Sequence, residues 1–172
     1  MSAYVLETAR LSLREMVPGD LDFLATMLSD PQVMRFYPKP LARSEAEGWL
    51  ERQFARYASD GHGLWLVTER KSGLPVGQVG LLMQRVDALR TNPHPEIGYL
   101  LHRPYWGHGY ATEAALGVRD YAFTQCGYPA VISLIRPENL PSRAVAARLG
   151  MQALAETSFA GFRHLVHRLA RQ

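Results

Sequence analysis

Cysteine is scarce in this 172-residue sequence, and long apolar runs are missing. The single cysteine, Cys126, excludes an internal disulfide and any metal site built from several cysteines. No apolar stretch approaches the roughly 18 residues that a membrane span needs. The first residues, Met1 to Tyr4, lack the basic-then-apolar order of a signal peptide. These observations predict a cytoplasmic protein with no membrane partner, and a buried, inert Cys126.

Lysine is scarce too, so arginine carries almost all of the positive charge. The 19 basic side chains outnumber the 16 acidic ones, which gives a net charge of +3. Lys39 and Lys71 are the two lysines, and the whole excess of positive charge falls in the second half of the chain. A mild positive bias suits an anionic ligand. No run of about five to eight Lys and Arg residues occurs, so we expect no nucleic-acid partner.

The length fits a single domain over residues 1–172, because no repeat or long linker divides the chain. Apolar patterning predicts strands over residues 11–16, 64–68, 76–83, 96–101 and 130–135, and two more around Ala160 and Gly161. Capping residues and helical spacing predict helices that begin at Asp20, at a Ser44–Glu47 capping box, between residues 107 and 112, and at Asn139. This order of elements predicts a mixed α/β sheet.

A short glycine motif carries the strongest chemical signal. The strand over residues 96–101 leads to Gly107-x-Gly109, and a helix follows. Glycines let a ligand approach the backbone, and a helix start offers free N–H groups to a phosphate. A tight turn without a ligand would show the same pattern. Thr112 replaces the third glycine of a dinucleotide fingerprint, and the Gly-Lys-Ser/Thr of a Walker loop is missing, so both of those sites are disfavoured.

Four segments together resemble one known family. They are Thr8 to Arg14, Ser29 to Met34, Gly98 to Ala114 and Asn139 to Met151. On these motifs the sequence resembles the GNAT superfamily of N-acetyltransferases, specifically its RimJ/RimL-like branch, from Leu6 to about Leu169. The resemblance implies a single α/β (mixed α+β) domain. Its central sheet would be mostly antiparallel, with a splayed parallel strand pair and helices on both faces.

In this family acetyl-CoA lies between the splayed strands. We expect no metal, because the sequence contains no cluster of ligand residues. The resemblance implies that the backbone of Tyr99, Leu100 and Leu101 pairs with the pantetheine arm. The pyrophosphate would be held by backbone N–H groups and one hydroxyl, from Gly107, His108, Gly109, Tyr110, Ala111 and Thr112. Asn139 and Arg148 would add contacts from the last helix. Pro104 stands where the family has Gln or Arg, and Arg103 lies one residue early, so that side-chain contact stays open.

Two residues are candidates for proton transfer. Ser142 occupies the family position beside the cofactor sulfur, where many members use a tyrosine to protonate the leaving thiolate. Glu96 opens the strand that should line the cleft, and a carboxylate there could accept the amine proton through water. Strand alternation places Glu96 on the face opposite Tyr99. His94 and Asp87 are rival bases, and a solvated strand-end charge is the alternative interpretation of Glu96.

The predicted activity is transfer of an acetyl group to a primary amine by direct attack on the thioester. The acceptor is a protein N-terminus or a small amine such as a polyamine, an amino acid or an aminoglycoside. The loops over residues 35–40 and 87–95 should shape its pocket. A catalytically silent acyl-CoA sensor and an unrelated nucleotide-binding domain are the alternatives, and a homodimer is left open. Three aromatic residues are expected in the core rather than at a ligand: Trp49, Phe54 and Trp65. Glu113 receives no chemical role.

Overall fold

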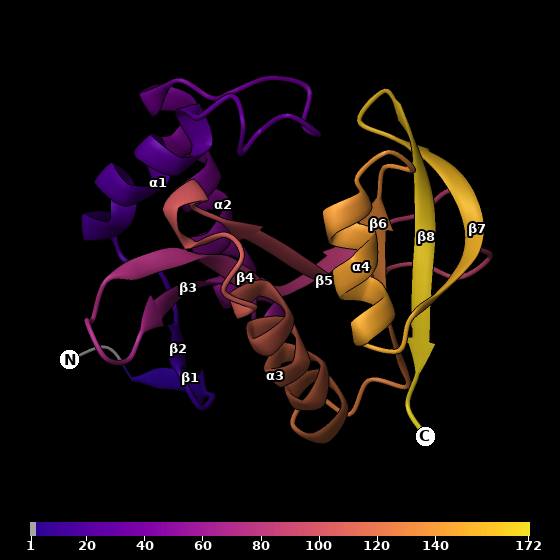
Figure 1. Ribbon diagram of the computed structural model, residues 1–172. Helices are drawn as coiled ribbons and strands as arrows, with labels where there is room; N and C mark the ends of the chain where they lie inside the picture. The colour runs from indigo at the N-terminus through magenta and orange to yellow at the C-terminus, as the bar shows by residue number, and fades with distance from the viewer. Residues whose placement is uncertain (1–2) are drawn as a thin grey trace.

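The computed structural model describes residues 3–172, which form one eight-stranded sheet with helices on both sides (Figure 1). The strands are β1 (Tyr4–Glu7), β2 (Leu11–Arg14), β3 (Leu64–Glu69), β4 (Pro75–Gln84), β5 (His94–Leu101), β6 (Ala130–Ile135), β7 (Gln152–Phe159) and β8 (Phe162–Ala170). The α-helices are α1 (Leu21–Ser29), α2 (Arg43–Asp60), α3 (Tyr110–Thr124) and α4 (Leu140–Arg148). Two short 3-10 helices are η1 (Pro18–Asp20) and η2 (Arg103–Tyr105). Among residues 3–172, no helix is both long and apolar enough to cross a bilayer.

The sheet is mixed, as predicted. Its strand order is β1-β2-β3-β4-β5-β6-β8-β7. Only β5 and β6 run parallel, and every other neighbouring pair is antiparallel. The parallel pair lies near the middle of the sheet. Parallel strands need a crossover connection, and α3 provides it across one face of the sheet (Figure 1).

Helices bury the two faces of the sheet in separate apolar clusters. On one face, α1 and α2 place Leu24, Leu28 and Leu50 against Leu64 and Leu66 of β3. On the other face, the alanine-rich side of α3 and the buried side of α4 pack on the strands. Small side chains let α3 lie close to the sheet, which brings its N-terminus to the end of β5.

The strands predicted from sequence are confirmed, with ends shifted by one or two residues. Strand β1 was not predicted, because its four residues carry no turn signal on the N-terminal side. The predicted Ser44–Glu47 capping box was wrong. Helix α2 begins at Arg43, and the Glu45 carboxylate accepts the Ala42 backbone N–H at 2.8 Å. Only half of a capping box therefore forms, two residues earlier than predicted, because the alanine at the N-cap has no side-chain acceptor.

The parallel pair separates almost at once. Its register joins only Glu96 to Ile132. One residue further on, the Ser133 hydroxyl donates to the Ile97 carbonyl at 2.8 Å, so a side chain replaces a bond of the backbone ladder. Beyond this point the edges of β5 and β6 diverge, which leaves an opening through the sheet between its two helical layers.

Candidate active site

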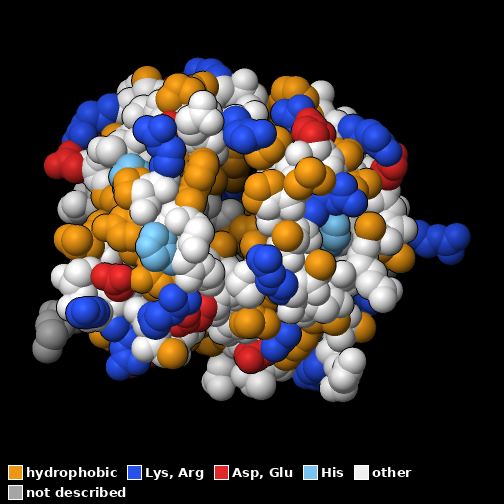
Figure 2. All heavy atoms as spheres, in the orientation of Figure 1, with side chains coloured by type: hydrophobic (Ala, Val, Ile, Leu, Met, Phe, Trp, Pro, Cys, Tyr) orange, Lys and Arg blue, Asp and Glu red, His pale blue; other side chains and the backbone are white. Residues whose placement is uncertain are grey.

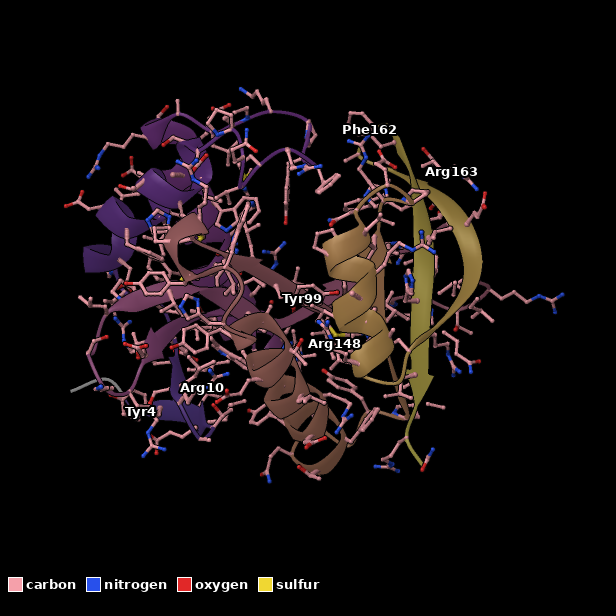
Figure 3. All side chains as sticks on the ribbon, viewed as in Figure 1. Tyr4, Arg10, Tyr99, Arg148, Phe162 and Arg163 are labelled. Atoms are coloured by element: carbon pink, nitrogen blue, oxygen red, sulfur yellow. The ribbon has the colours of Figure 1, made fainter. Side chains whose placement is uncertain are left out.

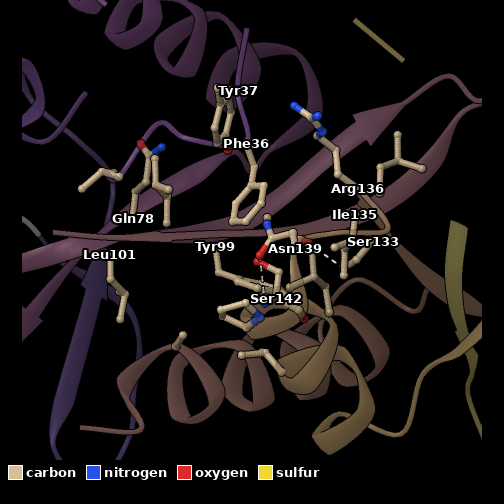
Figure 4. A pocket seen from close by; sticks show the side chains of 18 of the residues that line it. Phe36, Tyr37, Gln78, Tyr99, Leu101, Ser133, Ile135, Arg136, Asn139 and Ser142 are labelled. Carbon is tan, nitrogen blue, oxygen red and sulfur yellow. Dashed lines mark hydrogen bonds between the residues drawn. The ribbon is translucent and has the colours of Figure 1, made fainter. Parts of the chain in front are cut away.

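A cavity of about 800 Å³ occupies the opening between β5 and β6. Figure 2 shows a hollow near the middle of one face, with hydrophobic and basic side chains around it. Residues of both helical layers line the cavity: Tyr37 and Trp49 on the α1–α2 side, and Tyr110 and Ser142 on the α3–α4 side. A ligand in this opening would therefore contact groups on both sides of the sheet (Figure 4).

The glycine loop forms one end of the cavity. Gly107 and Gly109 both adopt left-handed backbone conformations, with φ of 79° and 76°. Gly109 is the residue at which α3 begins, and Gly107, Gly109, Tyr110, Ala111 and Thr112 line the cavity. The first N–H groups of a helix have no partner within it and favour negative charge. The structure therefore places the free N–H groups of the helix start and both predicted glycines at this end of the cavity.

His108 is the one residue of the predicted Gly107–Thr112 set that does not line the cavity. Its ring stacks on Tyr110 with 5.4 Å between centroids, and its carbonyl accepts a hydrogen bond from Arg10 Nη1 at 2.9 Å. The Arg103 side chain pairs with Asp30, with 3.1 Å between Arg103 Nε and Asp30 Oδ2, and Arg103 does not line the cavity.

Arg10 and Glu113 hold the glycine loop in place, a role that sequence reasoning missed. Arg10 Nε lies 2.6 Å from Glu113 Oε2, and the guanidinium lies 4.6 Å from the Tyr110 ring centroid. Glu113 also accepts the Thr8 hydroxyl at 2.6 Å. Burial tends to raise the pKa of Glu113, but these donors together hold that pKa below its usual range. The turn between β1 and β2 is thus fastened to the first turn of α3.

The backbone of β5 offers alternate residues to the cavity. The Ile97 carbonyl accepts from Ser133 and the Leu101 carbonyl accepts from the Trp106 indole at 2.9 Å, so these carbonyls point away from β4. The Leu100 carbonyl instead lies against Gly77 of β4. Because backbone groups alternate between the two edges of a strand, Tyr99 presents its N–H and C=O toward the cavity. The Leu100 carbonyl thus faces β4 and not the opening, which argues against the predicted pairing of the Leu100 backbone with a ligand, although Leu100 does line the cavity.

The start of α4 faces the same opening from the other strand (Figure 4). The Asn139 side chain accepts the Ser142 backbone N–H at 3.2 Å, which confirms the predicted cap. The Tyr99 hydroxyl donates to the Ser142 carbonyl at 2.6 Å, and burial raises the pKa of that hydroxyl. These bonds fix the backbone at Ser142 while its side chain lines the cavity. Arg148, at the other end of α4, lines the cavity and a groove shared with α3 (Figure 3).

Glu96 lies where the two strands separate. Its Oε1 accepts the Leu134 backbone N–H from β6 at 3.2 Å. Burial raises the pKa of Glu96 to about 7, against the opposing effects of the Leu134 hydrogen bond and the nearby Arg56. The rivals His94 and Asp87 do not line the cavity, and the His94 ring is hydrogen-bonded to the Thr91 carbonyl. Of the three candidate bases, Glu96 alone lines the cavity.

The α1–α2 side of the cavity has aromatic walls. Phe36 and Tyr37 come from the loop after α1, as predicted. Trp49 was expected in the core but lines the cavity, where its indole N–H donates to Gln78 Oε1 at 3.1 Å. No residue of the 87–95 loop lines the cavity, so its predicted part in the acceptor pocket was wrong. Trp65 is buried in the core, as predicted.

Metal-binding residues do not gather at this site. Across residues 3–172, no group of three or more His, Cys, Asp or Glu side chains is arranged to hold a metal ion. Cys126 is half-buried near the end of α3, and burial raises the pKa of its thiol.

Comparison with known proteins identifies the family to which this architecture belongs. The sequence model of one protein family, described as an acetyltransferase (GNAT) domain, matches residues 10–152 of this chain. This chain belongs to the GNAT family of acetyltransferases. The uncharacterized protein YkkB of Bacillus subtilis is 33% identical to this GNAT chain over 147 residues, which are 85% of this chain and 84% of YkkB. The predicted family and the assignment as an acyltransferase are therefore confirmed.

Solved structures share the whole fold of this GNAT domain. The crystal structure of an acetyltransferase from Agrobacterium tumefaciens superposes with a TM-score of 0.82 at 29% identity, covering 99% of this chain and 96% of that one. RimJ from Mycobacterium smegmatis, solved in complex with CoA-disulfide, superposes with a TM-score of 0.74 at 23% identity, covering 93% and 81%. The RimJ likeness shows that the two chains share one fold.

Proposed function

We propose that this GNAT protein is an acetyl-CoA-dependent N-acetyltransferase that moves the acetyl group directly to a primary amine. The observation that carries the proposal is the cavity through the sheet, which joins the glycine loop at the start of α3 to the half-buried carboxylate of Glu96 on the opposite side. Such an opening lets a donor and an acceptor enter from different sides and meet between β5 and β6. Holding two reactants in one place is itself a large part of catalysis.

The residues of the α3–α4 side fit a long phosphorylated cosubstrate. N–H groups at the Gly107–Ala111 loop would hold a pyrophosphate, with the Thr112 hydroxyl beside them. The cavity-facing C=O of Tyr99 would accept a hydrogen bond from an amide N–H of an extended arm, as in an added strand. Asn139 and Arg148 line the same side, and Arg148 would meet a further phosphate. When bound, acetyl-CoA supplies a thioester whose carbonyl an amine can attack.

Two side chains would move protons. An ammonium has no lone pair, so Glu96 would take a proton from the incoming amine, directly or through a water. Its pKa of about 7 makes it a competent base at neutral pH. Ser142, at the first turn of α4, would give a proton to the leaving thiolate. The N–H of Tyr99 faces the same opening and would stabilise negative charge on the attacked carbonyl oxygen.

Binding of the cosubstrate can be measured without turnover. Acetyl-CoA at a hundredfold excess over its dissociation constant should raise the free energy of unfolding by about 2.7 kcal/mol. A thermal melting series with acetyl-CoA, in buffer containing a metal chelator, provides the measurement. The absence of a shift at millimolar acetyl-CoA, or a shift that appears only when zinc is added, would contradict the proposed function.

Ser142→Ala should slow turnover more than it weakens acetyl-CoA binding. The cap should survive, since Asn139 is bonded to the backbone N–H of residue 142 and not to its side chain. Because a CoA thiol leaves readily without an acid, we expect a loss near the low end of general acid catalysis, about 10²-fold in kcat. Steady-state rates and melting shifts, compared with Ser158→Ala on the exposed β7, provide the test. Unchanged turnover would reduce Ser142 to a residue of the helix start.

A further inference from the structure

The acceptor side of the cavity is rich in arginine and poor in acid. Four arginines near this side line the cavity, against a single carboxylate, Glu96; they are Arg35, Arg52, Arg56 and Arg136. None of the ion pairs between described residues includes Arg35, Arg52 or Arg56. Glu96 itself is half-protonated near neutral pH, so it offsets little of this charge. The electrostatic potential on this side therefore favours an anion.

Helix α2 brings two of these cations to one face. Trp49, Arg52 and Arg56 follow one another at helical spacing, and all three line the cavity. The Arg52 guanidinium lies 5.7 Å from the Trp49 ring centroid, and the Trp49 indole is held by Gln78. Burial, and then the charge of Arg52, lower the pKa of Arg56. Two like charges one turn apart destabilise each other, so an anion placed between them would relieve the repulsion.

Arg136 adds a cation from the end of β6. Its guanidinium lies 4.2 Å from the Phe162 ring centroid and pairs with Glu138. Its Nε is buried without a hydrogen-bond partner, and Figure 4 shows the side chain above Ile135 at the edge of the cavity. An unpartnered buried donor is costly, which again favours an acceptor oxygen at this edge.

We propose that the acceptor is a primary amine that also carries a carboxylate, as an amino acid does. Its amine would lie beside Glu96, its carboxylate would face Arg52 and Arg56, and an apolar body would contact Phe36, Tyr37 and Trp49. This inference rests on the proposed acetyl transfer and selects among its acceptors. Polyamines and aminoglycosides would bring additional positive charges against the arginines, which disfavours them. A free amino acid and the N-terminus of an acidic peptide share the required chemistry.

An acceptor panel tests the inference. The assay would measure the free thiol released from acetyl-CoA. The acceptors would be the free amino acids, each compared with its amide, together with spermidine and kanamycin. Tripeptides that have an acidic or a neutral second residue would complete the panel. Rates would be corrected for the fraction of free amine at each pH. Loss of a hydrogen bond to a charged group predicts a kcat/KM about 10- to 100-fold higher for the best carboxylate-bearing amine than for its amide. The two arms, amino acids and acidic tripeptides, identify the source of the carboxylate.

Variants of α2 show whether arginine causes the preference. Arg56→Gln should bring the carboxylate-to-amide ratio of kcat/KM close to one, and Arg52→Glu, on a more exposed position, should reverse it. The ratio is the readout because any change in the pKa of Glu96 affects both acceptors equally. Arg90→Gln, on an exposed loop away from the cavity, should keep the wild-type ratio.

Two results would overturn the inference. One is a best acceptor that is a polycation or a neutral amide, and the other is a carboxylate preference that persists in both α2 variants. Acetyl-CoA melting shifts on the same samples separate these failures from failure of the proposed function. If the protein binds acetyl-CoA and acetylates spermidine best, the proposed acetyl transfer stands and the proposed carboxylate-bearing acceptor is refuted. A protein that shows no acetyl-CoA shift and acetylates no member of the panel refutes both.

Discussion

Gly109→Val should abolish acetyl-CoA binding while the protein still folds. Residue 109 has φ of 76°, a conformation that a branched side chain resists, and its added Cβ would lie 3.6 Å from Arg10 Nη2. The variant must therefore shift the loop that presents N–H groups at the start of α3, and its side chain would occupy the space where the phosphate approaches. The expected result is a melting temperature that no longer responds to acetyl-CoA.

The control for backbone strain is Gly127→Val. Gly127 has φ of 70° in the turn after α3, has open space around its Cβ position and does not line the cavity. A left-handed conformation costs an L-residue about 1–2 kcal/mol, so both variants should lose comparable stability. Only Gly109→Val should lose the response to acetyl-CoA. A folded Gly109→Val protein with wild-type affinity would show that the phosphate lies elsewhere.

Glu96→Gln should lower the rate at neutral pH by about 10²-fold or more and recover in part at high pH. The amide can still accept the Leu134 N–H, so the junction of β5 and β6 should stay intact, whereas it cannot take a proton from an amine. At high pH free amine is abundant and depends less on a base. Rates measured from pH 6 to pH 10 provide the test. The wild-type kcat/KM should also rise through pH 7 as Glu96 loses its proton.

His94→Ala and Asp87→Asn serve as matched controls, because neither residue lines the cavity. Both should retain wild-type rates and pH profiles. A larger loss in His94→Ala than in Glu96→Gln would transfer the role to His94. A loss in Glu96→Gln that is the same at every pH would make Glu96 a structural residue rather than a base.

The Glu96 carboxylate should also make the free energy of unfolding depend on pH. Burial raises its pKa from the ordinary 4.5 to about 7, so the folded protein binds this proton more tightly than the unfolded chain does. Glu96 therefore costs folding stability that grows as the pH rises from about 4.5 to about 7 and is constant above it. Glu96→Gln should remove this cost and raise the melting temperature at pH 8 relative to pH 5. Thermal unfolding of both proteins across this range checks the sign.

Much of the fold could be predicted because local signals agree with the tertiary structure. Ala130–Ile135 is a short buried apolar run bounded by turns, and it forms β6 as predicted. Asn139, Pro141 and Gly150 mark the two ends of α4 through capping and a left-handed exit, and the structure contains both ends. The turn that leads into α3 was visible because two of its left-handed positions, Gly107 and Gly109, favour glycine.

The acceptor side could not be predicted to the same depth. Trp49, Arg52 and Arg56 show helical spacing, but the sequence does not say whether that face of α2 covers the core or an opening. The opening exists only because β5 and β6 pair at one position, which depends on contacts between segments far apart in the chain. The salt bridge of Arg10 with Glu113 joins residues 103 positions apart, so no local pattern could reveal it.

The most direct test of the account is a single-turnover reaction of the wild-type protein with acetyl-CoA and the acceptor panel, with products analysed by mass spectrometry. The account predicts one N-acetylated amine for each CoA released, and no release above the buffer rate without an amine. Bound acetyl-CoA that stays intact with every amine, including the free amino acids and the acidic tripeptides, would contradict the account and identify the protein as an acyl-CoA sensor.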